Sequence, residues 1–366
     1  MSLSNFTETR EKDLKVVAIG GGTGLSTLLR GLKRYVATPD RRKGVRLGSA
    51  PEPVSAAPPC PSLKCVIREL SAVVTVTDDG GSSGRLREDF KMLPPGDIRN
   101  CMVALSEDEH LLSKLFQFRF EHGDLGGHSF GNLFVAALSH ITGDFAQAVQ
   151  MSSQILATRG RIFPSTNTNV GLVAEMDDGS LVRGETNITA SKHSIVELRL
   201  EPETADPLPE TLEAIANADL ITLGPGSLYT SLITNLLVRG IPEALEASKA
   251  TRVFVCNLMT QANESLGLTA AQHIEKIMQH AEGTSSPIFD YALINTGPIS
   301  AVRLAQYARE GQQPIEADLD LIRALGVEPV TGNFVHEGDV LRHDYDRVAE
   351  RVLALGLERL AAPLTR

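Results

Sequence analysis

Short apolar runs alternate with longer segments of helical periodicity along most of this chain. Apolar runs bounded by turn residues are typical of buried strands in a parallel sheet. They predict strands at 16–20, from about 71 up to Asp78, and at 155–157, 220–223, 252–257, 291–295 and 327–330. Helices are predicted at 25–32, 97–105, 111–120, 132–141, 144–153, 230–237, 269–280 and 345–360. This alternation predicts a three-layer α/β architecture with a mostly parallel sheet.

Two segments depart from this pattern. In residues 170–200, polar and apolar positions alternate around a turn at Asp178-Gly179, and a further strand is predicted at 195–200. This is the signal of a β-hairpin, so we expect an antiparallel excursion from the main sheet. Segment 38–64 contains six prolines and a basic cluster. Its composition predicts an exposed, disordered insertion.

Composition and charge narrow the functional class. The chain has 366 residues, of which 42% are hydrophobic and 22% charged, as in an ordinary globular protein. Its formal net charge of −10 argues against general nucleic-acid binding, which needs a basic surface. No apolar run is long enough for a membrane span, and residues 1–15 lack the apolar stretch of a secretory signal. The four cysteines show no CxxC pair or zinc spacing. We therefore expect a cytoplasmic protein with reduced thiols.

The segment 73–85 carries the strongest chemical signal. Two adjacent carboxylates follow its strand, at the edge where open α/β sheets bind ligands. Glycines then allow a close approach of the backbone, and hydroxyl and guanidinium groups donate to oxygen atoms. The candidate phosphate contacts here are Asp78, Asp79, Ser82, Ser83 and Arg85. Asp78 and Asp79 are also candidate Mg²⁺ ligands, and the choice between them stays open because successive strand residues face opposite ways. The same composition is also common in ordinary turns.

Two further turns between strand and helix are rich in glycine and hydroxyl groups. The first turn matches neither the P-loop nor the dinucleotide motif, and no acidic ribose partner follows it. Free N–H groups at a helix N-terminus nevertheless attract anions. The candidate contacts to phosphate or sugar are Gly21, Gly22, Thr23 and Gly24 in the first turn, and Gly226, Ser227 and Thr230 in the second. The alternative for each turn is a purely structural role, with Ser231 as a helix cap.

A weaker signal lies at residues 127–132, a glycine, histidine and serine segment that opens a helix. Its residues can be contacts to a sugar or base, or only caps and packing residues. The candidates are Asn100, His128, Ser129 and Asn132. The chain contains no HExxH or GxSxG motif, so no catalytic residue is predicted.

Five motifs occur in order: Val17–Ser26, Thr77–Arg85, Leu93–Asn100, Gly127–Asn132 and Leu223–Ser231. Together they resemble the YvcK-like gluconeogenesis factor family, which is related to the phospholactate transferases of the CofD-like superfamily. The resemblance extends from about residue 15 to 345 and implies a single Rossmann-like α/β/α domain, followed by a C-terminal helix at 345–366. It implies a homodimer that binds a UDP-sugar such as UDP-N-acetylglucosamine across the carboxyl ends of the strands. Transferase relatives hold a metal and a diphosphate near the aspartate that matches Asp78 and Asp79.

Two functions follow as hypotheses. The first is a regulatory UDP-sugar-binding protein that needs no cofactor, acts on a partner enzyme of amino-sugar metabolism, and supports cell shape and wall precursor supply during gluconeogenic growth. The second is a Mg²⁺-dependent phosphotransferase that resembles 2-phospho-L-lactate transferase. A nicotinamide dehydrogenase is disfavoured because the first glycine turn lacks the acidic ribose partner.

Overall fold

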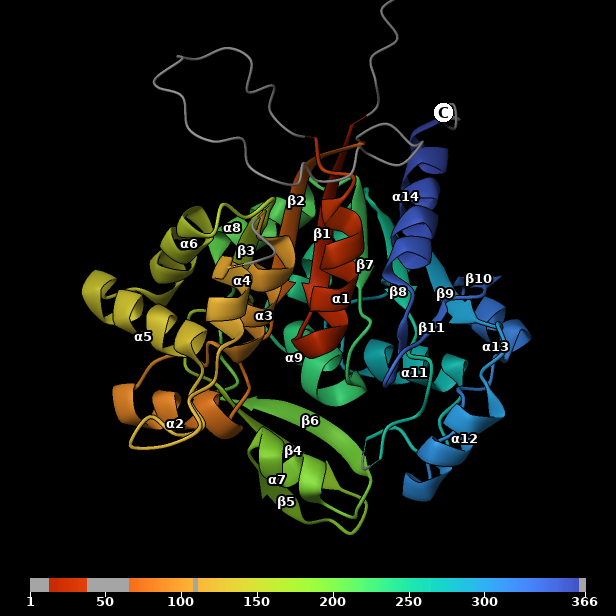
Figure 1. Cartoon of the computed structure of the whole chain (residues 1–366). Coiled ribbons are helices and arrows are strands. Elements are labelled where there is room, and N and C mark those ends of the chain that lie inside the picture. The colour runs from red at the N-terminus through yellow and green to blue at the C-terminus, as the bar shows by residue number, and fades with distance from the viewer. Residues whose placement is uncertain (1–12, 38–65, 108–110, 263, 362–366) are drawn as a thin grey trace, which may run out of the picture.

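The computed structural model describes residues 13–37, 66–107, 111–262 and 264–361. At its centre lies a seven-stranded parallel sheet in the order β10-β9-β8-β7-β1-β2-β3 (Figure 1). Its strands are β1 (Leu14–Gly20), β2 (Ile67–Val74), β3 (Arg161–Pro164), β7 (Leu220–Leu223), β8 (Thr251–Val255), β9 (Tyr291–Asn295) and β10 (Glu328–Gly332). The predicted α/β fold with a mostly parallel sheet is confirmed.

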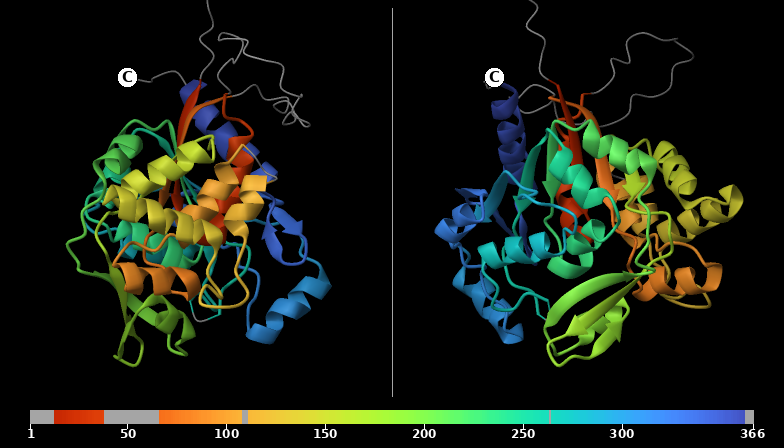
Figure 2. Two further views of the ribbon diagram at one scale, coloured as in Figure 1. Left: turned by 60° about the vertical axis from the view of Figure 1, so that its left-hand side comes forward. Right: turned by 180° about the vertical axis from the view of Figure 1, so that it is seen from behind.

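Helices cover both faces of this sheet, as the opposite views in Figures 1 and 2 show. One face carries α1 (Gly22–Lys33), α3 (Gly96–Leu105) and α14 (Tyr345–Ala361). The other carries α8 (Pro209–Ala216), α10 (Ile241–Ala247) and α11 (Ala270–Gln279). The remaining helices are α2 (Gly81–Phe90), α4 (Leu111–Gln117), α5 (Phe130–Thr142), α6 (Phe145–Ile155), α7 (Glu185–Ala190), a π-helix η1 (Leu228–Ile233), α9 (Thr234–Leu236), α12 (Ala301–Tyr307), a 3₁₀-helix η2 (Ala308–Glu310) and α13 (Leu319–Ala324).

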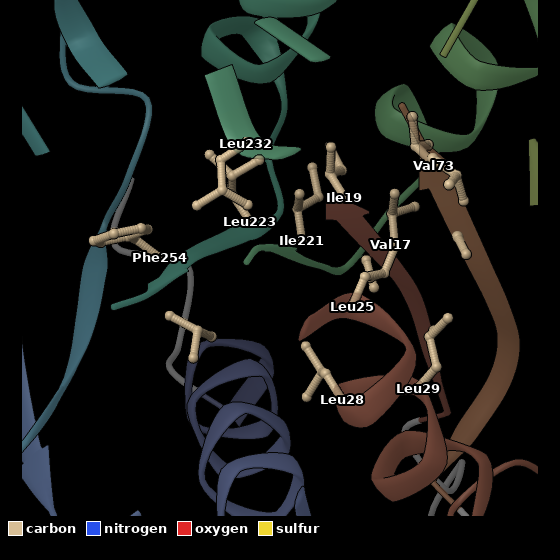
Figure 3. Close-up of a cluster of buried hydrophobic side chains, with 14 of the residues drawn as sticks. Val17, Ile19, Leu25, Leu28, Leu29, Val73, Ile221, Leu223, Leu232 and Phe254 are labelled. Carbon is tan, nitrogen blue, oxygen red and sulfur yellow. The ribbon is translucent and has the colours of Figure 1, made fainter. Parts of the chain in front are cut away.

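The core forms where α1 packs on the sheet. Leucines recur on α1 at the i, i+3, i+4 spacing of an amphipathic helix. Figure 3 shows Leu25 directed toward the strand residue Val17, and the side chains of Leu25, Leu28 and Leu29 are at most 1% exposed. Burial of each large aliphatic side chain stabilises the fold by about 1.5–3 kcal/mol. This packing places the N-terminus of α1 firmly at the carboxyl end of β1.

The antiparallel excursion is confirmed as a separate three-stranded sheet, in the order β5-β4-β6. Its strands are β4 (Gly171–Met176), β5 (Leu181–Arg183) and β6 (Ile195–Glu201), with α7 between β5 and β6. Figure 1 shows this small sheet beyond the carboxyl ends of the parallel strands. A two-stranded antiparallel sheet near the C-terminus pairs β11 (Val335–Glu337) with β12 (Leu341–His343). Among the described residues, we find no helix with the length and apolar character that crossing a membrane requires.

Several predicted boundaries are wrong. Strand β2 begins four residues earlier than expected and ends at Val74, so the two aspartates follow an extended segment rather than the strand itself. Residues 81–90 form α2 instead of a loop, and the predicted strand at 155–157 lies at the end of α6. A short apolar run does not distinguish the last turn of a helix from a strand. The predicted insertion 38–64 lies outside the described residues.

Candidate functional site

The strand order places a topological switch between β1 and β7. From β1 the chain continues to β2 on one side, whereas from β7 it continues to β8 on the other side. The loops after these two strands therefore separate, and ligands of open α/β sheets bind in the resulting crevice. A cavity of about 540 Å³ lies there. It is lined by Gly21, Gly22, Thr23, Gly24, Thr27, Asp78, Asp97, Glu185, Pro225, Gly226, Ser227, Ser231, Asn257, Leu258, Met259, Thr260, Gln261, Ala262, Tyr307, Gln312, Leu341, Arg342 and His343.

Two larger hollows lie elsewhere on the described surface. One of about 680 Å³ lies beside α6 and β3, and one of about 920 Å³ lies beside β6 and α10. Neither includes the glycine turns at the switch point. We take the smaller cavity as the candidate site, because it combines the switch point with a high density of backbone, hydroxyl and amide groups.

The first glycine turn forms the N-terminus of α1. Helix α1 begins at Gly22, whose φ of +60° lies in the left-handed region that favours glycine. The first N–H groups of a helix have no partner within it, so they are available to an anion in the cavity. The carboxylate of Asp97 lies beside this turn, because a Cβ atom at Gly21 would lie 2.9 Å from Asp97 Oδ2.

The two loops at the switch point touch at Gly24. A Cβ atom at this position would lie 2.2 Å from the carbonyl oxygen of Pro225 in the second glycine turn. Only a residue without a side chain allows so close an approach of two backbones. Gly24 therefore determines how closely the two walls of the cavity meet.

Side chains from the segment after β8 support the second glycine turn. The Asn257 side chain accepts a hydrogen bond from the Gly226 N–H at 3.2 Å and donates one to the Gly226 carbonyl at 2.7 Å. Gln261 Nε2 donates to Ser227 Oγ at 3.1 Å. These contacts hold Gly226 and Ser227 at the cavity wall.

Glu264 explains the position of Thr230. Its carboxylate accepts hydrogen bonds from the Tyr229 N–H at 3.1 Å and from Thr230 Oγ1 at 2.8 Å. Burial raises the pKa of this carboxyl group. The Thr230 hydroxyl thus binds Glu264 at the start of η1, and Thr230 does not line the cavity. Ser231, which we considered as a helix cap, instead lies within η1 and lines the cavity.

Three carboxyl groups line the other side of the cavity: Asp78, Asp97 and Glu185. Burial, together with the nearby charge of Asp78, raises the pKa of Asp97 to about 7. Burial, together with the charges of Asp78, Asp97 and Asp79, raises the pKa of Glu185 to about 8. Asp97 and Glu185 therefore take up protons near neutral pH, in a region where negative charges accumulate.

The structure separates the two adjacent aspartates. Asp78 lines the cavity, whereas the Asp79 carboxylate accepts hydrogen bonds from the Thr186 N–H at 2.8 Å and from Thr186 Oγ1 at 2.6 Å. Asp79 thereby connects the main domain to α7, which also carries Glu185. Asp78 is the member of the pair that a ligand in this cavity would meet.

The predicted site residues fall into two groups. Those at the cavity are Gly21, Gly22, Thr23, Gly24, Asp78, Gly226 and Ser227. Those outside its lining are Asp79, Ser82, Ser83, Arg85, Asn100, His128, Ser129, Asn132 and Thr230.

Several members of the second group have protein partners of their own. The Ser82 hydroxyl lies 3.1 Å from His128 Nδ1 and accepts from Asn132 Nδ2 at 3.1 Å. Ser129 is the N-cap of α5, and its hydroxyl accepts from the Asn132 N–H. Arg85 donates to the Gly126 carbonyl at 2.9 Å.

Sequence reasoning missed several residues that line the cavity. We considered Asp97 only as the N-cap of a helix, but Pro95 takes that position and Asp97 faces the first glycine turn. Glu185 lies in the short helix α7, after the predicted hairpin, and was not among the predicted site residues. Arg342 is the one arginine or lysine among the described residues that line the cavity. His343 Nε2 lies 3.0 Å from the Cys256 carbonyl, and burial lowers the pKa of His343 to about 4, so its ring is neutral at pH 7.

Comparisons with known proteins agree with this architecture. A family model described as 2-phospho-L-lactate transferase CofD matches residues 16–335. The gluconeogenesis factor of Halalkalibacterium halodurans is 45% identical over 344 residues, which cover 93% of this chain and 96% of the relative. The gluconeogenesis factor of Bacillus subtilis is 43% identical over 343 residues, which cover 93% and 98%.

A solved structure supports the same relationship. The crystal structure of a UPF0052 family protein from Bacillus halodurans is 44% identical to this chain and superposes with a TM-score of 0.81. The match covers 93% of this chain and 99% of that protein. The resemblance of the five motifs is confirmed, and the chain belongs to the gluconeogenesis factor family, among the proteins that the CofD model describes.

Proposed function

We propose that this protein binds a nucleotide sugar of the UDP-sugar class in the cavity at the switch point, and that it acts as a regulatory binding protein. The observation that carries the proposal is the pairing of two glycine-rich turns, one at the N-terminus of α1 and one before η1, across a single cavity. Helix N-termini and exposed backbone N–H groups are suited to a diphosphate. A volume of about 540 Å³ lies within the range of about 300–1,000 Å³ usual for ligand pockets.

The cavity offers more than a phosphate cradle. Asn257 and Gln261 place amide groups along one wall, and Leu258, Met259 and Leu341 add apolar surface. A nucleotide sugar presents this mixture of hydroxyl groups, amide-like edges and an apolar ring face. Arg342 supplies a guanidinium group that suits a phosphate oxygen.

The three carboxyl groups set the conditions under which such a ligand binds. A diphosphate is repelled by negative charge on these carboxyl groups, so binding strengthens when Asp97 and Glu185 are protonated or when a divalent cation accompanies the ligand. We expect UDP-N-acetylglucosamine to bind more tightly at pH 6 than at pH 8 in the absence of metal.

We place this binding in the cytoplasm and in a homodimer. Occupancy of the cavity would change contact with a partner enzyme of amino-sugar metabolism, and would support cell shape and wall precursor supply during gluconeogenic growth. The family name of the curated relatives supports the link to gluconeogenic growth.

The acidic cluster favours a second candidate, a Mg²⁺-dependent transferase of a phosphorus-containing group. Carboxylate oxygens are the ligands that Mg²⁺ prefers, and Mg²⁺ usually binds through one or two of them together with substrate phosphates. Among the described residues at this cavity, no three acidic or histidine groups bring their ligand atoms within 4.8 Å of one another. The donor set therefore fits an ion carried by a phosphorylated ligand and held by Asp78 with Asp97 or Glu185. Such an ion would supply charge neutralisation at the phosphate.

Calorimetry with UDP-N-acetylglucosamine, with and without Mg²⁺, tests the first proposal. We expect one binding event per chain and an intact ligand on chromatography after incubation. Asp78→Ala should leave binding partly intact or lower it modestly. Absence of binding at millimolar ligand refutes the proposal. A product that forms only with Mg²⁺, a nucleotide donor and an acceptor, and that Asp78→Asn abolishes, establishes the transferase instead.

A further inference from the structure

Three arginines from separate elements converge on one loop outside the cavity. Arg85 of α2 donates to the Gly126 carbonyl at 2.9 Å, and Arg119 donates to the carbonyl of the next residue, Gly127. The side chain of Arg99, from α3, packs so closely on Gly131 that a Cβ atom there would lie 2.8 Å from Arg99 Cδ. The side chains of all three arginines therefore contact residues 126–131, at the start of α5, and the Arg99 guanidinium also donates to Asn100 Oδ1 at 2.7 Å.

This cluster of Arg85, Arg99 and Arg119 has no anionic partner in the described part of the chain. None of the three forms an ion pair within 4.0 Å, although seventeen such pairs are recorded among the described residues. The Nε atom of Arg99 is buried and makes no hydrogen bond. A buried donor without a partner costs free energy, and a ligand that reaches it recovers that cost.

The electrostatics of the loop point in the same direction. Burial and the charge of Arg119 both lower the pKa of Arg99, while Asp97 and Asp78 oppose this shift. The pKa of His128 is lowered as well. Burial is the largest cause, the charges of Arg85 and Arg119 lower it too, and the charge of Asp89 opposes them. The positive charges thus repel one another, and His128 stays neutral. A bound anion relieves this repulsion.

The N-terminus of α5 adds to the attraction. This helix runs from Phe130 to Thr142, thirteen residues, and its N-cap Ser129 lies within the loop that the arginines surround. The partial positive charge of a helix N-terminus favours an anion. Figures 1 and 2 show α2, α3 and α4 grouped around the start of α5.

We propose that Arg85, Arg99 and Arg119 form a second ligand site, independent of the nucleotide-sugar cavity, that binds a phosphate group. Phosphate is favoured over a carboxylate for two reasons. Its three free oxygens accept hydrogen bonds from several guanidinium groups at once, and its charge of about −1.5 to −2 at neutral pH better balances three cations. Because Asp97 and Asp78 lie close enough to act on Arg99, the phosphate site adjoins the acidic side of the cavity.

Calorimetry of the full-length protein with inorganic phosphate at constant ionic strength tests this proposal. We expect saturable binding that persists when UDP-N-acetylglucosamine is present in excess, and weaker binding of acetate. Arg119→Ala and Arg85→Ala change exposed side chains and should each weaken phosphate binding about tenfold, since charge-assisted hydrogen bonds are lost. Arg119→Lys should recover only part of this loss, because an ammonium group lacks the fork of donors.

The matched control is Arg183→Ala, an exposed arginine that pairs with Glu201 in the small sheet and should leave phosphate binding unchanged. Thermal unfolding of each variant shows whether the fold is retained. The proposal is overturned if Arg85→Ala and Arg119→Ala bind phosphate as the unaltered protein does. It is also overturned if excess nucleotide sugar displaces the phosphate, because the phosphate then occupies the glycine turn.

Discussion

The contact between the two glycine turns yields a sharp prediction at Gly24. Replacement by alanine would ordinarily stabilise a helix by about 0.5–1 kcal/mol. Here the new Cβ atom would lie 2.2 Å from the Pro225 carbonyl oxygen, 2.6 Å from its carbon and 2.9 Å from the Gly226 nitrogen. These are backbone atoms, which have no rotamer to move away, and overpacking of this kind costs about 1–3 kcal/mol. We therefore expect Gly24→Ala to lower the free energy of unfolding by roughly 1–2 kcal/mol.

The same change should alter ligand binding, because the two turns form opposite walls of the cavity. We expect the affinity for UDP-N-acetylglucosamine to fall by at least tenfold in calorimetry, while urea unfolding reports the loss of stability. Arg30→Ala is the control: Arg30 is exposed on the same helix and does not line the cavity, so stability and binding should both stay near their original values. A Gly24→Ala protein that is as stable as the original and binds equally well would refute the contact between the turns.

Two further predictions concern the carboxyl groups and the second turn. The pKa values of Asp97 and Glu185 rise to about 7 and 8 from ordinary values of 3.8 and 4.5, so the folded protein holds more protons than the unfolded chain between about pH 4 and 8. Stability from this source is present at low pH and is lost as the pH rises through that window; a Glu185→Gln protein should show a smaller decline in melting temperature from pH 5 to 9, and an identical decline would contradict the assignment. Asn257→Ala removes both hydrogen bonds to Gly226 and should cost about 1–3 kcal/mol in urea unfolding, whereas the exposed Asn217→Ala control should cost little.

Helix α2 shows why part of the site was misread. Its first residues are Gly81, Ser82, Ser83 and Gly84, which have low helix propensity and are typical of loops. In the folded protein Ser82 and Ser83 are buried, and a Cβ atom at Gly84 would lie 2.0 Å from the Asp79 carbonyl oxygen. The close packing of this turn against the preceding segment makes the helix stable despite its composition. Local propensity carries no information about such packing.

The division of Asp78 and Asp79 depended in the same way on distant residues. Adjacent side chains of an extended segment face opposite ways, so the sequence predicted that one aspartate faces a ligand but not which one. Thr186, more than a hundred residues later, binds Asp79 and leaves Asp78 at the cavity. Asp97 and Glu185 also line the cavity with Asp78, because helix α3 places Asp97 at the cavity and α7 of the small sheet places Glu185 there.

By itself, the sequence determined the alternation of strands and helices, the separate antiparallel hairpin and the glycine turns at the ends of β1 and β7, because periodicity and turn chemistry act over a few residues. Only the tertiary structure decided that β1 and β7 are neighbours, that Gly24 meets Pro225, and that one set of predicted residues lines a cavity while the arginines gather elsewhere. Strand order and the approach of distant loops result from packing across the whole sheet, which no local pattern of residues encodes.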